Sequence, residues 1–335
     1  MFRDRFSERL DWDVPKGGAL AVATTAVLVV VLSLVTVFDV AVADRGIGVF
    51  EPLSPPIGTV LAVAGLVTQL GDPWFLLLLA SVAYLIESER WSIRETRDGA
   101  FVLAVTFAAF SLVDLLKNVF LAPRPPGAGS VTLPTWLPPV LAGSFRSITT
   151  GTGYAFPSGH ALGTTAVFAA IAYKLDIGSP VARWAVAGAG IVLVIASRVV
   201  LGVHYLVDVS VGVLAGISLV AVAIAIGDRR PLNVFALGAG LGTLAVLASA
   251  FSPAGEIWKA GQWLGASLGA GGAWYAVSPS YHLDPVEALV AGIPIAVAWV
   301  AIYVTSPPLP VTVVGTAAAA GLTVLAPTLV ARIRR

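Results

Sequence analysis

The sequence predicts an all-α fold, a polytopic bundle of membrane-spanning helices, and two observations support this. Of its 335 residues, 57% are hydrophobic and only 12% are charged, which is about half the charged fraction of an ordinary soluble domain. Apolar stretches also recur along the chain, and most reach the roughly 18 residues that a helix needs to cross a bilayer.

Composition excludes several kinds of chemistry. The chain has no cysteine, so disulfides, thiolate metal sites and cysteine nucleophiles are ruled out. A net charge of +1 gives no indication of a nucleic acid partner. Residues 1–18 mix acidic and basic side chains, and no small-residue cleavage site follows them. We therefore expect a cytoplasmic tail followed by a retained first span, not a cleaved signal peptide.

Six spans are predicted before the composition changes near residue 230, at residues 19–43, 73–87, 99–122, 159–175, 181–201 and 204–227. The apolar stretch 57–87 is too long for one straight helix, and it is interrupted at Gly71-Asp72-Pro73. Its first part, 57–71, is predicted to be a short interfacial or re-entrant piece. Residues 126–156 are predicted to form a loop, with Trp136 at headgroup depth.

The region 231–335 is richer in alanine and glycine and is predicted to add about four spans, at residues 232–251, 258–277, 284–304 and 309–331. The second of these is only weakly apolar, although its small residues suit close helix packing. The chain is thus expected to divide into the tail 1–18, a core 19–230 and a C-terminal extension 231–335, to which the sequence assigns no role.

Lysine and arginine predict the orientation. They cluster in five segments, at residues 3–16, 90–97, 174–183, 229–230 and 332–335. All five fall on the cytoplasmic side if the N-terminus is inside and the extension contributes four spans. The outward-facing exceptions include Arg124, Arg146 and Arg198.

Charged and polar residues gather at four span ends. They are Lys117 and Arg124 at the end of span three, Ser158, Gly159 and His160 at the start of span four, Arg198 at the end of span five, and His204 and Asp208 at the start of span six. Because successive spans alternate in direction, these four ends share one membrane face, whichever way the protein is inserted. They can therefore form a single site.

The residue types favour a phosphoryl ligand. Lys117, Arg124 and Arg198 provide positive charges that suit a dianion. Ser158 is placed to cap span four, and the unpaired N–H groups of a helix start bind anions. Gly159 leaves room for an anion to approach the backbone.

The histidines favour covalent catalysis. His204 and Asp208 are four residues apart, so they lie on one helical face, and the carboxylate can hold Nδ1–H while Nε2 points outward. One histidine can then attack phosphorus while the other, protonated beside the anion, donates to the leaving oxygen. Arginine and lysine can stabilise the developing charge, so no metal or other cofactor is predicted.

The order and spacing of these residues resemble the tripartite signature of the type-2 phosphatidic acid phosphatase superfamily. The three parts are Lys117-x6-Arg124-Pro125, Pro157-Ser158-Gly159-His160 and Ser197-Arg198-x5-His204-x3-Asp208. The superfamily also contains vanadium-dependent haloperoxidases and bacterial undecaprenyl-pyrophosphate phosphatases. The motifs resemble it over residues 100–228, and the six-span layout over residues 19–228.

The resemblance implies that residues 19–230 form a six-span phosphatase core. It implies that His204 forms a phosphohistidine, that Asp208 orients it and that His160 is the acid. Phosphate would be bound by Lys117, Arg124, Ser158, Gly159 and Arg198. The expected reaction is metal-independent hydrolysis of a lipid phosphate or isoprenoid pyrophosphate at the extracytoplasmic face of the cell membrane.

Two alternative functions remain open. A lipid phosphotransferase would use the same site with another acceptor, and an anion transporter or lipid flippase would use the same cations. The second leaves the His204–Asp208 pair unexplained. The candidate substrates are isoprenoid pyrophosphate, phosphatidate and phosphatidylglycerophosphate. Nearby, Asp114 is expected to pair with Lys117, and Asp72 is expected to be a turn residue.

Overall fold

The computed structural model describes residues 18–39, 58–86, 96–176, 178–253, 256–277 and 283–334. In these ranges the regular secondary structure is helical, apart from one isolated bridge between Ile86 and Leu283. Seven of the helices are long and apolar enough to cross a membrane, or up to eight if a bent pair counts as one span. The predicted all-α, polytopic bundle is therefore confirmed. The predicted tail 1–18, apart from Gly18, lies outside the described residues.

The helices are α2 (Gly18–Val37), α3 (Gly58–Thr68), η1 (Gln69–Gly71), α4 (Pro73–Leu85), α5 (Thr96–Phe120), η2 (Pro139–Leu141), α6 (Ala142–Thr149), α7 (Gly159–Lys174), α8 (Pro180–Val200), α9 (Leu206–Gly227), α10 (Pro231–Ala250), α11 (Ile257–Val277), α12 (Pro285–Thr305) and α13 (Leu309–Ile333). Each predicted span from α5 onward agrees with its helix to within three residues at both ends. The predicted loop 126–156 contains η2 and α6. Three helices of the bundle are not among the seven: the 16-residue α7, α11, and α4, which belongs to the bent pair.

The apolar stretch 57–87 is interrupted where the sequence predicts. The segment α3–η1 and α4 meet at an angle of 44°. Pro73 starts α4, and the side chain of Asp72 caps it by accepting from the N–H of Trp74 at 3.4 Å. Proline is tolerated at a helix start but not in its interior, and a capping aspartate supplies the missing acceptor. Together these residues end one helix and begin another.

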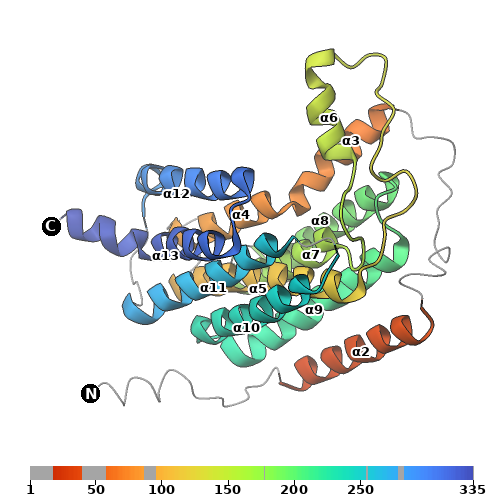
Figure 1. Ribbon diagram of the computed structural model, residues 1–335. Helices are drawn as coiled ribbons and strands as arrows, with labels where there is room; N and C mark the ends of the chain where they lie inside the picture. The colour runs from red at the N-terminus through yellow and green to blue at the C-terminus, as the bar shows by residue number, and fades with distance from the viewer. Residues whose placement is uncertain are drawn as a thin grey trace.

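Helix α5 lies at the centre of the bundle (Figure 1), and most of its residues are buried. Helices α4, α7, α10 and α11 all pack against it. Helices α3 and α6 project together from one end of the bundle, and α2 lies along α9 (Figure 1). The structure therefore has a long helical body with a small projection at one end.

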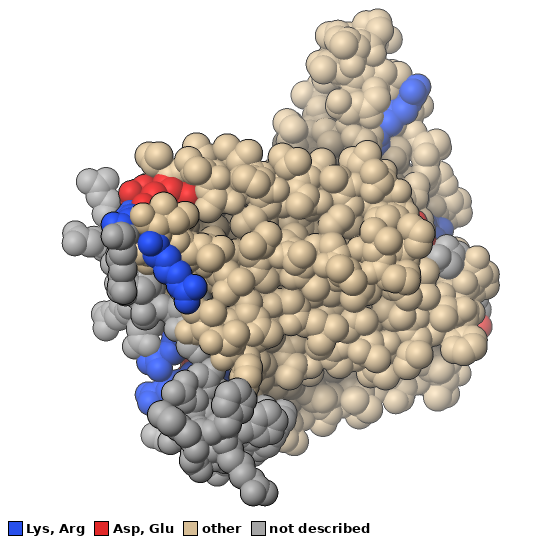
Figure 2. Space-filling model, turned by 60° about the vertical axis from the view of Figure 1, so that its left-hand side comes forward, with Lys and Arg blue, Asp and Glu red and all other residues tan. Residues whose placement is uncertain are grey.

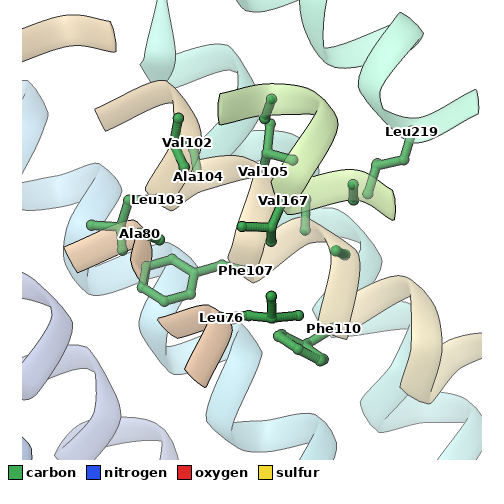
Figure 3. Close-up of a cluster of buried hydrophobic side chains, with 14 of the residues drawn as sticks. Leu76, Ala80, Val102, Leu103, Ala104, Val105, Phe107, Phe110, Val167 and Leu219 are labelled. Carbon is green, nitrogen blue, oxygen red and sulfur yellow. The ribbon is translucent and has the colours of Figure 1, made fainter. Parts of the chain in front are cut away.

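The core forms where α4, α5, α7 and α9 meet. Leu76, Phe107, Phe110, Val167 and Leu219 belong to one buried cluster (Figure 3). Because lipid chains are as apolar as these side chains, helix association in a membrane depends on close packing more than on the hydrophobic effect. Small residues supply that closeness: a Cβ at position 216 of α9 would lie 2.8 Å from the carbonyl oxygen of Leu162 in α7.

The C-terminal extension is joined to the core through α5 and α4. Trp263 of α11 stacks on Phe110 of α5, with ring centroids 4.7 Å apart. The hydroxyl group of Tyr84 in α4 donates to the carbonyl oxygen of Val324 in α13 at 2.8 Å. Of the four helices after residue 230, α10 and α11 pack against α5, α13 packs against α11 and α4, and α12 packs against α13. The extension is therefore continuous with the core.

Charges mark the end of the bundle opposite the predicted site. The ammonium group of Lys174, at the end of α7, lies 2.9 Å from Asp98 at the start of α5 and 2.8 Å from Asp228 after α9. Between the ends, the face drawn in Figure 2 is almost free of charged side chains, which are confined to its margins and the projecting segment. This distribution is typical of a protein that spans a bilayer.

Candidate active site

The four predicted span ends meet at one end of the bundle. The N–H of Ser158 donates to the carbonyl oxygen of Asp208 at 2.9 Å, which joins the start of α7 to the first turn of α9. The N–H of Ala155 donates to the carbonyl oxygen of Ala122, also at 2.9 Å, which joins the segment before α7 to the segment after α5. Backbone hydrogen bonds therefore hold the predicted motifs together directly.

His204 and Asp208 form a buried pair. Nδ1 of His204 lies 3.3 Å from Oδ2 of Asp208, and the two side chains are 1% and 0% exposed. The same Oδ2 accepts from the N–H of Tyr205 at 2.9 Å. Because a carboxylate only accepts, the shared proton lies on Nδ1, which leaves the lone pair on Nε2. This is the geometry of a histidine nucleophile.

His204 lies before α9, and not inside the helix as the prediction of a span at 204–227 implied. The helix begins at Leu206 because Asp208 reaches back to the N–H of Tyr205. The carboxylate therefore both caps the helix and holds the imidazole.

Arg124 links His204 to the surrounding loops. Its Nε donates to the carbonyl oxygen of Thr152 at 2.9 Å, and its Nη1 donates to that of Val203 at 2.9 Å. The same Nη1 lies 3.2 Å from Nε2 of His204. A Cβ at Gly151 would lie 2.8 Å from Nη1, so a glycine is needed beside the guanidinium. Sequence reasoning did not identify Gly151.

Arg198 is almost fully buried, with 4% of its surface exposed. Its Nη1 donates to the hydroxyl oxygen of Thr68 at 2.8 Å, while its Nε has no hydrogen-bond partner among the residues described. A buried guanidinium with a donor to spare suits an anionic ligand. Thr68 lies 130 residues away in sequence, and no local pattern pointed to it.

The start of α7 lies beside Lys117. Ser158 caps the helix, and its hydroxyl oxygen accepts from the N–H of Ala161 at 3.4 Å. A Cβ at Gly159 would lie 3.0 Å from the side chain of Val113 and 3.7 Å from Nζ of Lys117. The free N–H groups of the helix start and a lysine ammonium group therefore share one small region, as an anion site requires.

His160 faces a carboxylate that the sequence placed only in a turn. Its Nε2 lies 3.8 Å from Oδ2 of Asp72, with side chains 19% and 33% exposed. A Cβ at Gly71 would lie 3.3 Å from Cδ2 of the same ring. The helix break between η1 and α4 therefore contacts the site, in addition to ending a helix.

The surroundings favour an unprotonated His204. Burial is the main reason that the pKa of His204 lies well below its ordinary value of 6.5, and the cations Arg124, Arg198 and Lys117 lower it further. Both causes disfavour a further positive charge on the imidazole. The surroundings therefore favour the neutral form of the His204 imidazole.

Asp114 lies between Lys117 and the extension. It acts electrostatically on Lys117 and lies near Trp263 of α11. The expected pairing with Lys117 is not seen as an ion pair among the described residues. Near the same end, the hydroxyl groups of Tyr154 and Ser252 are 3.1 Å apart, which ties the loop before α7 to the end of α10. The extension therefore reaches the edge of the site.

An apolar groove of about 330 Å³ runs between α3 and α8. Its lining includes Val60, Val63, Val67, Leu193, Ala196 and Val200. Ser197 also lines it, and the next residue in the chain is Arg198 of the cationic site. Ser197 is the residue of the groove that lies next in the chain to the cationic site.

In the described part of the chain, no group of three or more histidine, aspartate or glutamate residues could hold a metal ion.

Fold and site define a multi-pass membrane protein with a cationic, histidine-containing pocket at one end of its helical bundle. Residues 99–231 match the family model described as PAP2 superfamily, which confirms the resemblance over the segment that carries all three motifs.

A similar solved structure is described as the first transmembrane PAP2 type phosphatidylglycerolphosphate phosphatase from Bacillus subtilis. It is 24% identical, the match covers 61% of this chain and 93% of that chain, and the TM-score is 0.43. No curated protein matches the sequence significantly.

Proposed function

We propose that the protein is an integral membrane phosphatase that hydrolyses a lipid phosphate or isoprenoid pyrophosphate through a phosphohistidine at His204. The observation that supports this most directly is the buried His204–Asp208 pair, in which Nε2 of His204 lies 3.2 Å from Nη1 of Arg124. The match of residues 99–231 to the PAP2 superfamily supports the same class of reaction.

In the first step, the phosphoryl group is bound by Lys117, Arg124 and Arg198, by the hydroxyl group of Ser158 and by the N–H of Gly159. Nε2 of His204 attacks phosphorus, a P–N bond forms, and the bond from phosphorus to the ester or anhydride oxygen breaks. His160 gives a proton to that leaving oxygen. Asp208 stabilises the positive charge that develops on the attacking imidazole.

In the second step, water attacks the phosphohistidine. His160, now neutral, accepts a proton from that water, and the P–N bond breaks to release inorganic phosphate and regenerate His204. Charge on the phosphoryl oxygens is stabilised throughout by fixed cations, which cost no reorganisation during the reaction. Arginine and lysine fill the part that a metal ion plays in other phosphatases.

Two features support a lipid substrate at the outer face. The α3–α8 groove is apolar, and Ser197 in its lining is followed in the chain by Arg198, so an acyl or isoprenoid chain could lie there while the phosphate binds the cations. At the opposite end, Lys174, Arg229 and Arg230 lie near the ends of α7 and α9. The positive-inside rule assigns that end to the cytoplasm and the pocket to the other side.

Phosphate release from phosphatidate, phosphatidylglycerophosphate and an isoprenoid pyrophosphate, with the purified protein in detergent, tests this function. We expect release from at least one of them, unchanged by EDTA, and its loss in His204→Ala and His160→Ala variants that still elute as folded protein. Release at the wild-type rate by the His204→Ala variant would disprove the phosphohistidine mechanism. Transfer to an added alcohol in preference to water would identify a phosphotransferase.

A further inference from the structure

The helix break at residues 71–73 places a carboxylate beside the second histidine. Oδ2 of Asp72 lies 3.8 Å from Nε2 of His160. This separation is within ion-pair distance, although it is longer than a hydrogen bond. The Nε2–Cδ2 edge of the ring faces this turn, since a Cβ at Gly71 would lie 3.3 Å from Cδ2. The opposite edge, which carries Nδ1, faces away from the turn.

Three contacts hold Asp72 in this place. Its side chain caps α4 through the N–H of Trp74, and Pro73 fixes the first turn of that helix. Just before the break, the hydroxyl group of Thr68 accepts from Arg198 at 2.8 Å. Gly71 also packs closely, because a Cβ there would lie 2.6 Å from the side chains of Thr164 and Val194. The turn is therefore anchored to α7 and α8 just before the carboxylate, and the cap joins the carboxylate to α4.

The charge around His160 explains why a carboxylate is needed. The groups that act electrostatically on it are Arg198 of α8, Lys117 of α5, Arg124 after α5 and His204 before α9. An imidazolium among these cations would be strongly disfavoured without an anion close by. Asp208 is engaged with His204. Within the described ranges, the carboxylate at ion-pair distance from His160 is that of Asp72.

We propose that Asp72 is a positioning residue that orients His160 and stabilises its protonated form for proton donation to the leaving oxygen. The inference rests on the proposed function, in which His160 is the acid. In the first step the Nδ1–H proton moves to the leaving oxygen. The imidazole then keeps its Nε2–H facing Asp72, which is the tautomer that accepts a proton from water on Nδ1 in the second step.

The test compares Asp72→Asn with wild type on two substrates. Asparagine caps a helix as well as aspartate does, so the variant keeps the start of α4 and removes only the charge. A matched control is Asp284→Asn, which makes the same change at the cap of α12. Phosphatidate has a poor alkoxide leaving group that needs an acid, whereas the leaving group of p-nitrophenyl phosphate does not.

We expect kcat on phosphatidate to fall about 10–100-fold in Asp72→Asn, part of the roughly 10²–10⁴-fold that general acid catalysis contributes. On p-nitrophenyl phosphate the fall should be less than about 3-fold. The high-pH decline of kcat on phosphatidate should begin at lower pH, because the imidazolium loses its counter-charge. Asp72→Glu should restore part of the activity, and Asp284→Asn should match wild type.

Equal losses on both substrates with an unchanged pH profile, or no loss at all, would overturn the role of Asp72 while leaving the phosphatase intact. Loss of phosphatidate hydrolysis in His160→Ala would show in that case that the acid itself was assigned correctly. Failure of the wild-type protein to release phosphate from any substrate would refute the proposed function, and this inference with it. Thermal unfolding and size-exclusion profiles of both asparagine variants separate these outcomes from misfolding.

Discussion

Nη1 of Arg124 lies 3.2 Å from Nε2 of His204, so the nitrogen that we propose as the nucleophile faces a guanidinium group. The same Nη1 donates to the carbonyl oxygen of Val203, the residue before the histidine. A phosphoryl oxygen that binds this arginine is thereby brought next to Nε2. Arg124 can therefore align the phosphate with the nucleophile in addition to neutralising its charge.

Replacing Arg124 with lysine should lower kcat/KM for phosphate release about 10²-fold, because an ammonium group cannot make the guanidinium contacts to Thr152, Val203 and phosphate together. The matched control is Arg146→Lys, since Arg146 is exposed on α6 and should tolerate the change. Phosphate release measured over a range of substrate concentrations gives kcat/KM for wild type and both variants. An Arg124→Lys variant with more than half the wild-type kcat/KM would contradict an alignment role.

His204 should remain neutral at mildly acidic pH, because its pKa lies well below 6.5 through burial and then through the nearby cations. Since the unfolded chain takes up this proton first, the resulting contribution to stability is fully present above about pH 6.5 and is lost as the pH falls toward the lowered pKa. The chain has three histidines, so imidazole NMR with a His204→Gln reference can follow this ring. A titration midpoint at pH 6.5 or above would be inconsistent with the structure.

A tryptophan at Ala196 should fill the α3–α8 groove and interfere with a lipid chain. We expect KM for a long-chain lipid phosphate to rise about 10-fold, because the lipid chain would then bury less apolar surface, with little change for a short soluble phosphate. Val192→Trp, also on α8 but with an exposed side chain outside the groove, is the control. If both substrates respond alike, the groove does not hold the lipid chain.

Gly269 and Gly272 of α11 should respond oppositely to alanine. A Cβ at Gly269 would lie 1.9 Å from the carbonyl oxygen of Ala317 in α13, whereas a Cβ at Gly272 would meet nothing within 4 Å. We expect Gly269→Ala to lower the free energy of unfolding by roughly 1–3 kcal/mol through overpacking. Gly272→Ala should raise it by up to about 1 kcal/mol through lower chain entropy. Thermal unfolding in detergent measures both, and equal melting temperatures would argue against close α11–α13 packing.

Features that depend on the order of residues along the chain could be predicted from the sequence. The lengths of the predicted spans and their alternating directions are enough to predict that Lys117, Arg198 and His204 share one end of the bundle. The cap at Ser158 and the break at Gly71-Asp72-Pro73 could also be predicted, because glycine, proline and capping residues act locally. The same local rules fixed the helix ends from α5 onward to within three residues.

Contacts between distant segments could not be predicted in this way. Thr68 reaches Arg198 across 130 residues, and Asp72 reaches His160 only because a helix break is packed against α7 and α8. Gly151 matters for the space that Arg124 needs, and a single sequence gives no measure of that space. The start of α9 was placed two residues early, because the capping role of Asp208 competes with extension of the helix through His204.

The packing of α10 and α11 against α5 has a practical consequence for anyone preparing this protein. A chain cut near residue 230 would remove Trp263 and leave the carboxyl group of Asp114 toward acyl chains, where an ionisable group is strongly disfavoured. Asp114 is only one helical turn from Lys117, so the damage would reach the phosphate site. The expressed protein should therefore include residues 231–335, even though the match to the PAP2 family model ends at residue 231.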